Sequence, residues 1–178
     1  LVAPTDLACG PDGRLFVTES GDVDHRRPTG TSRLLWLAGG EAATIRDLGP
    51  CFANGIAFDE AGRLLWTETA TRRVGRLEDG EARVVAELPG GHLPDGLALA
   101  RDGRIFVATL TSGGITVLGP DGALLDHLAV GAEPTNCAFH GSTLIVTGST
   151  DSSGDPGTGL VLAVETDAEP LPLHAGRV

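Results

Sequence analysis

The feature that most constrains this fold is a phrase that occurs four times along the chain. Its copies read PTDLAC, FANGIAF, LPDGLAL and EPTNCAF, and they align on Ala8, Ala57, Ala98 and Ala138. The aligned alanines are separated by 49, 41 and 40 residues. A repeat of this period is typical of architectures in which one small structural unit is stacked several times. We therefore expect a chain built from four similar units.

Each phrase opens a unit with the pattern of four short β-strands. In the first three units a turn follows, GPDGR, DEAGR or ARDGR, whose glycine suits the positive φ of a tight hairpin. Three more strand-like segments complete each unit, and the last segment of the fourth unit is PLPLHAG. Four-stranded antiparallel units of about 40–45 residues predict an all-β fold, a β-propeller of about four blades forming a single domain over 1–178. A β-sandwich or a parallel β-helix explains this repeat period less well.

The residues that precede the innermost strands of a propeller meet at one mouth of its central channel. Three positions before the aligned alanines lie Thr5, Asn54, Asp95 and Thr135, all with oxygen-bearing side chains. Such oxygens are the ligands that Ca²⁺ prefers. Asn-Gly and Asp-Gly are also common turn dipeptides, but a shared repeat position favours a ligand-binding ring. His92, in the loop before Asp95, is a candidate substrate contact, with a solvated loop histidine as the alternative.

Composition excludes several classes of partner. The 13 basic and 24 acidic residues give a net charge of -11, which repels nucleic-acid phosphates and anionic lipids. No apolar run approaches the ~20 residues of a membrane-spanning helix, so no membrane partner is expected. Three cysteines without a Cys-x-x-Cys pair indicate neither a disulfide framework nor a thiolate zinc site. These features predict a soluble, cytoplasmic protein.

The repeated phrases carry a resemblance to a known family. PTDLACGPDGRLFVTESG, FANGIAFDEAGRLLWTETATRRVGRL and the stretch from HLPDGLAL to ITVLGPDGALL closely resemble the gluconolactonase / senescence-marker-protein (regucalcin) family of six-bladed propellers. The match extends over nearly all of the chain. Against six blades the chain supplies four, and the resemblance implies that the two others would precede Leu1.

The resemblance implies a metal-dependent lactonase acting on small, sugar-type lactones. Family members hold a divalent ion, Ca²⁺ or Zn²⁺ among others, with a first-blade Glu, an Asn that matches Asn54 and an Asp that matches Asp95. The ion would act as a Lewis acid and Asp95 as general base, with Thr5, His92 and Thr135 near the substrate. Thr5 stands where the family commonly has Asn, and no Glu of this chain occupies the position of the first-blade ligand.

Two other hypotheses remain open at this point. The first is a non-catalytic propeller that binds a small molecule or a protein partner through the same channel mouth. The second is an inactive, truncated family member. A propeller with open blade edges also predicts a homo-oligomer, because unpaired edge strands are templates for association.

Overall fold

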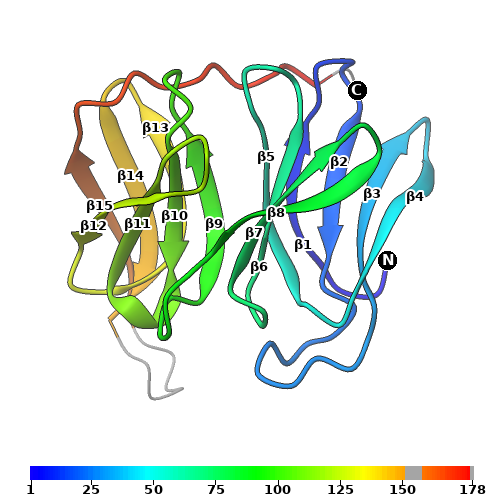
Figure 1. Cartoon of the computed structure of the whole chain (residues 1–178), viewed down its shortest axis with the longest axis horizontal. Coiled ribbons are helices and arrows are strands. Elements are labelled where there is room, and N and C mark those ends of the chain that lie inside the picture. Colours follow the sequence, from blue (N-terminus) through cyan, green and yellow to red (C-terminus); the bar gives the residue numbers. More distant parts are fainter. Residues whose placement is uncertain (151–157, 177–178) are drawn as a thin grey trace.

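The computed structural model describes residues 1–150 and 158–176, and it confirms the all-β architecture (Figure 1). Four antiparallel sheets follow one another along the chain, one for each repeat. Blade 1 contains β1 (Pro4–Cys9), β2 (Leu15–Glu19), β3 (Ser32–Ala38) and β4 (Glu41–Gly49). Blade 2 contains β5 (Ala53–Phe58), β6 (Leu64–Glu68), β7 (Arg73–Glu78) and β8 (Glu81–Glu87).

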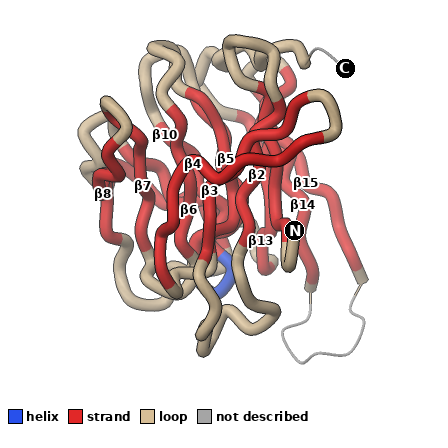
Figure 2. Tube along the Cα trace, turned by 90° about the vertical axis from the view of Figure 1, so that its right-hand side faces the viewer, coloured by secondary structure: helices blue, strands red, loops and turns tan. Residues whose placement is uncertain are grey.

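The second half of the chain repeats this arrangement. Blade 3 contains β9 (Pro94–Leu99), β10 (Ile105–Thr109), β11 (Gly114–Leu118) and β12 (Leu124–Ala129), with the 3₁₀ turn η1 (Leu110–Ser112) after β10. Blade 4 contains β13 (Glu133–His140), β14 (Thr143–Ser149) and β15 (Gly159–Glu165). Figure 2 shows the strands running through the body of the molecule, with the loops gathered at its two ends.

The turn glycines explain the hairpins that open each of the first three blades. Gly13, Gly62 and Gly103 have φ values of 81°, 75° and 85°, a conformation that glycine adopts without steric cost. The N–H of each donates to the carbonyl three residues earlier, at 2.9–3.0 Å. The repeated phrase therefore forms the innermost strand, and the segment after the turn pairs with it as predicted.

The hydrophobic core lies between neighbouring blades. Leu34, Ile56, Leu64 and Trp66 pack between blades 1 and 2, and each is at most 4% exposed. A second cluster, which contains Val107, joins blades 2 and 3. A third cluster joins blades 3 and 4. The inner strands β1, β5, β9 and β13 consequently lie next to one another in that order, while no comparable packing joins β13 to β1.

The prediction that PLPLHAG forms the outer strand of blade 4 is wrong. Within the described residues the blade 4 sheet has three strands, and the segment 170–176 instead crosses the end of the channel (Figure 1). Pro170 forms an isolated bridge with Ala100, and the Leu171 N–H donates to the Leu99 carbonyl at 3.1 Å. Pro170 and Pro172 carry no N–H, which disfavours a ladder along blade 4.

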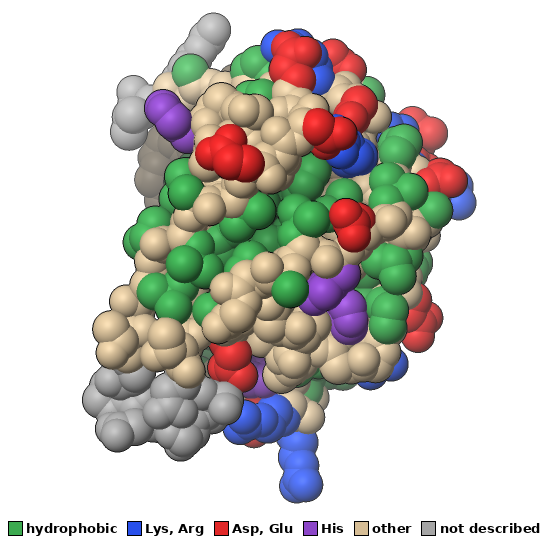
Figure 3. All heavy atoms as spheres, turned by 90° about the vertical axis from the view of Figure 1, so that its left-hand side faces the viewer, with side chains coloured by type: hydrophobic (Ala, Val, Ile, Leu, Met, Phe, Trp, Pro, Cys, Tyr) green, Lys and Arg blue, Asp and Glu red, His purple; other side chains and the backbone are tan. Residues whose placement is uncertain are grey.

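Blade 4 turns an apolar surface outward. Figure 3 shows hydrophobic side chains gathered across this side of the molecule, and Val161 of β15 is 69% exposed. On β1, at the other end of the row of blades, Leu7 is 59% exposed. Association through these edges stays a prediction. No helix within the described ranges is long and apolar enough to cross a membrane.

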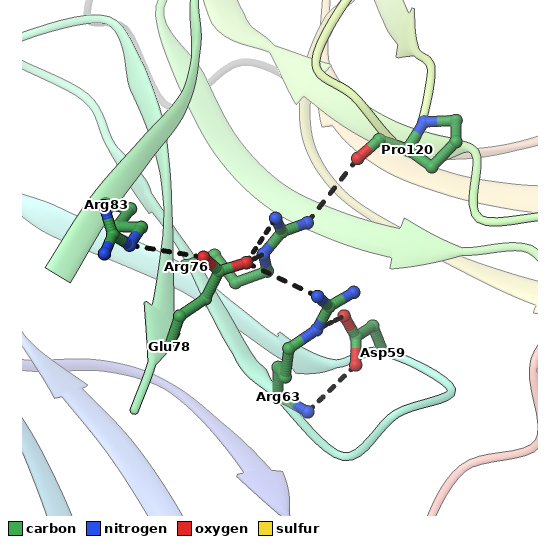
Figure 4. A network of polar contacts seen from close by, with 6 residues as sticks. All are labelled: Asp59, Arg63, Arg76, Glu78, Arg83 and Pro120. Carbon is green, nitrogen blue, oxygen red and sulfur yellow. Dashed lines mark hydrogen bonds and ion pairs between the residues drawn. The ribbon is translucent and has the colours of Figure 1, made fainter. Parts of the chain in front are cut away.

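A charged network on the outer strands links blade 2 to blade 3 (Figure 4). The Glu78 carboxylate contacts Arg63, Arg76 and Arg83, with nitrogen–oxygen distances of 2.5–3.4 Å. The Arg76 guanidinium also donates to the Pro120 carbonyl at 3.5 Å. Since the Glu78 side chain is 25% exposed, water and salt weaken these pairs.

Glu78→Gln tests how much this network contributes to the free energy of unfolding. We expect the free energy of unfolding to fall by about 1 kcal/mol at low salt, because the amide keeps its shape and loses its charge. The loss should shrink when sodium chloride is raised to about 1 M, where the Debye length is about 3 Å. Urea melts at both salt concentrations measure the difference. A loss that does not depend on salt would contradict an ionic origin.

Candidate active site at the channel mouth

Two glycines let the inner strands approach each other where the predicted site lies. A Cβ on Gly55 would stand 2.5 Å from the Asp95 carbonyl oxygen, and one on Gly96 would stand 2.0 Å from Oδ1 of Asn136. Neither position has room for a side chain. Asn54 and Asp95, which directly precede these glycines, are therefore brought to adjacent places at the start of β5 and β9.

Asp95 is the electrostatic centre of the site. Its carboxylate accepts a hydrogen bond from the Asn54 side chain, whose amide nitrogen also donates to the Thr69 hydroxyl at 3.2 Å. Burial, and next the negative charge of Asp6, raise the pKa of Asp95 to about 7, against the opposing effect of the Asn54 hydrogen bond. A carboxyl group with this pKa gains and loses its proton near neutral pH, as a general base must.

Asp6 is a functional candidate that the sequence interpretation missed. Its Oδ2 accepts the Ile56 N–H of blade 2 at 3.2 Å, and its Oδ1 accepts the Leu7 N–H at 2.8 Å. Burial raises the pKa of Asp6, and these hydrogen bonds act in the opposite direction. The signal was available, because Asp6 is the acidic member of the repeat position that Gly55 and Gly96 share.

Threonines on the second strands hold the backbone of the site. The Thr18 hydroxyl donates to the Asn54 carbonyl, and the Thr67 hydroxyl donates to the Asp95 carbonyl at 2.6 Å. Each threonine belongs to the blade before the residue that it holds, and both are fully buried. These hydrogen bonds join neighbouring blades at the starts of β5 and β9, where Asn54 and Asp95 lie.

The structure places the other predicted residues in different surroundings. The Thr5 hydroxyl donates to the Ala53 carbonyl at 2.8 Å, so it ties blade 1 to blade 2 beside Asn54. Thr135 bonds Thr147 within blade 4, at 3.3 Å. The ring of His92 lies against Thr116 of β11 and His127 of β12. Substrate contacts by these three residues stay predictions.

A cavity of about 470 Å³ lies at the other end of the channel. The four aligned alanines line it, and the segment from Pro170 to His174 closes over it. Asp6 is shared between this cavity and the surroundings of Asp95. The cavity walls are otherwise mainly apolar, so the polar chemistry of the channel is concentrated at the mouth where the inner strands begin.

The side chains at the mouth fit a divalent metal in type. The amide oxygen of Asn54 and the carboxylate of Asp95 are hard oxygen donors of the kind that Ca²⁺ takes, and both come from adjacent strands. Within the described residues no group of three or more His, Cys, Asp or Glu side chains is arranged to hold a metal ion. Metal binding by Asn54 and Asp95 therefore stays a prediction.

Most of the chain matches the sequence model of a known protein family. Residues 1–150 match the family model described as the SMP-30/gluconolactonase/LRE-like region. The chain belongs to the SMP-30/gluconolactonase/LRE-like family. The matched region contains every residue of the predicted site, and no curated protein gives a significant match to the chain.

Solved structures of known proteins share this fold. A luciferin-regenerating enzyme has a TM-score of 0.81 at 20% identity over 98% of this chain, and an Agrobacterium tumefaciens calcium-binding protein, regucalcin, has 0.80 at 20% over 98%. A Xanthomonas campestris gluconolactonase has a TM-score of 0.72 at 26% identity over 97% of the chain. The SMP-30-like chain spans 65%, 65% and 58% of these proteins, respectively.

Proposed function

We propose that this chain forms the catalytic face of a metal-dependent hydrolase of small, sugar-type lactones. The observation that carries the proposal is the Asp95 carboxyl group, largely buried at the channel mouth, with a pKa raised to about 7. Family membership and the similarity to a gluconolactonase support the reaction class. Buried carboxyl groups with strongly shifted pKa values are concentrated at functional sites.

The chain's own residues have distinct roles in this proposal. Asp95 in its ionised form removes a proton from the attacking water, and the hydrogen bond from Asn54 orients the carboxylate for that transfer. Burial, and next the negative charge of Asp6, keep the proton affinity of Asp95 high enough for it to act as a base. Asn54 and Asp95 would hold Ca²⁺ or Zn²⁺, which when bound supplies Lewis-acid polarisation of the lactone carbonyl.

A metal titration tests whether the mouth binds the ion. We expect Ca²⁺ or Zn²⁺ to stabilise the wild-type chain by about 2.7 kcal/mol at 100 times its dissociation constant. Asn54→Ala should remove the stabilisation by Ca²⁺, since it takes away one of two protein donors. Sodium chloride at equal ionic strength separates binding from simple screening of the net charge of -11.

Thermal unfolding and calorimetry, alongside hydrolysis of an aldonolactone, provide the measurements. Hydrolysis that requires the metal and fails in Asn54→Ala supports the lactonase. A wild-type chain that is not stabilised by Ca²⁺ and cleaves no lactone with either metal would overturn the proposal and favour a non-catalytic propeller.

A further inference from the structure

Two histidine rings lie against each other on the outer strands of blade 3. His127 belongs to β12 and is the cross-strand partner of Thr116 in β11, while His92 comes from the loop between β8 and β9. The ring centroids are 4.9 Å apart, with the ring planes inclined at 59°. The roles proposed for Asp95, Asn54 and Asp6 in hydrolysis do not explain why these two rings are paired.

A chain of hydroxyl groups fixes one nitrogen of His92. Nδ1 of His92 is 2.9 Å from the Thr116 hydroxyl, which is 3.1 Å from the Thr109 hydroxyl. The Thr109 hydroxyl donates to the Gly114 carbonyl at 2.8 Å and is 2.5 Å from the Ser112 hydroxyl, and with its proton on Gly114 its oxygen can accept from both Thr116 and Ser112. This direction of donation makes Thr116 the acceptor for an Nδ1–H of His92. The lone pair of His92 is then on Nε2.

That arrangement is the one seen around histidines that bind metals. Ligating imidazoles almost always donate the N–H of their other nitrogen to a protein oxygen, which fixes the tautomer and the ring orientation. Thr109 and Thr116 are fully buried, so the acceptor is held rigidly. The loop is anchored too, because the Leu110 N–H donates to the Leu93 carbonyl at 2.9 Å.

The spacing of the two rings matches a shared metal ion. With metal–nitrogen bonds of about 2.0–2.1 Å and tetrahedral geometry, two imidazole centroids would be roughly 5 Å apart. The observed separation is 4.9 Å. His127 also has a buried Nδ1 with no hydrogen-bond partner, an unsatisfied polar atom that calls for a ligand.

We propose that His92 and His127 form a second metal site, selective for borderline transition ions such as Ni²⁺, Cu²⁺ or Zn²⁺. Two imidazoles suit these ions and not Ca²⁺, which prefers oxygen ligands. Water completes the coordination, since both side chains are partly exposed. The net charge of -11 favours cation binding in general. This site stands independently of the lactonase proposal.

Calorimetric titration with Ni²⁺ alone tests the site in the whole chain. We expect one equivalent to bind the wild type and Asp95→Asn alike, and an excess of Ca²⁺ to leave that binding unchanged. His92→Gln and His127→Gln should each weaken Ni²⁺ binding at least tenfold. His140→Gln is the matched control, because His140 is an exposed histidine on blade 4.

Thr116→Val provides a second test that leaves both rings in place. Removing the buried acceptor should weaken Ni²⁺ binding about 10–100-fold, the effect typical of losing the oxygen that accepts a hydrogen bond from a metal-binding imidazole. Circular dichroism and thermal melts without metal verify that each variant is folded. Absence of Ni²⁺ binding by the wild type overturns the proposal. Binding lost in Asp95→Asn but kept in His127→Gln would also overturn it, and would place the ion at the channel mouth.

Discussion

Asp95→Asn is expected to lower the rate of lactone hydrolysis by about 10²–10⁴-fold, the contribution typical of a general base. The amide has the shape of the carboxyl group and still hydrogen-bonds, but it cannot take a proton from water at neutral pH. Divalent metal binding at the mouth should weaken as well, because the site loses its one charged ligand from β9. Initial rates with an aldonolactone, measured at saturating metal, give the first quantity.

The pH dependence of the wild-type enzyme follows from the same carboxyl group. Hydrolysis should rise with pH as Asp95 loses its proton, with a midpoint below about 7 when a cation is bound, since the positive charge favours the ionised form. Asp95→Asn should flatten this rise. The exposed carboxylate Asp47 on β4 provides the matched control, and Asp47→Asn should leave both the rate and the profile unchanged.

Stability of the metal-free chain should change with pH in a direction that the raised pKa determines. The folded state holds the Asp95 proton up to pH about 7, whereas the unfolded chain releases it near the ordinary aspartate pKa of 3.8. The folded state therefore gains stability at low pH and loses it as pH rises from about 4 to about 7. Asp95→Asn should remove that slope from urea melts. Equal slopes in the wild type and the variant would contradict a raised pKa.

The fold was largely predictable because the repeated sequence phrase forms the inner strand of each blade. The four alanines, which align in the sequence, line one cavity in the structure, because each blade places the same small side chain against the channel. Glycines at fixed places mark the hairpins and the close approach of β5 to β9. Local chemistry and tertiary structure agree at these positions, which makes sequence interpretation dependable there.

Other parts of the molecule depend on contacts that periodicity does not encode. The segment after Glu169 has apolar alternation like a strand, yet Pro170 bridges to Ala100 of another blade. His92 lies three residues before Asp95, but its ring direction is decided by Thr116 and His127 on neighbouring strands. The repeat position of Thr5, Asn54, Asp95 and Thr135 does not include Asp6, whose carboxylate lies one residue later in the repeat.

Gly55→Ala is expected to damage the fold and the site together. The added Cβ would lie 2.5 Å from the Asp95 carbonyl oxygen and 2.8 Å from Cα of Gly96, both backbone atoms that cannot rotate away. Relieving the contact requires β5 and β9 to separate. We expect a loss of about 3 kcal/mol, at the upper end of the range for overpacking, and a fall in Tm of roughly 6–12 °C.

The same displacement should reach the chemistry, because Asn54 and Asp95 hydrogen-bond across this strand pair. A shift of about 1 Å between reacting groups can cost 10²-fold in rate, so hydrolysis should fall by about that factor even where the variant remains folded. Gly90→Ala is the matched control. No atom lies within 4 Å of a Cβ at Gly90, so its stability should stay within about 0.5 kcal/mol of the wild type. If Gly55→Ala were as stable and as active as Gly90→Ala, contact between β5 and β9 would not be what holds Asn54 beside Asp95.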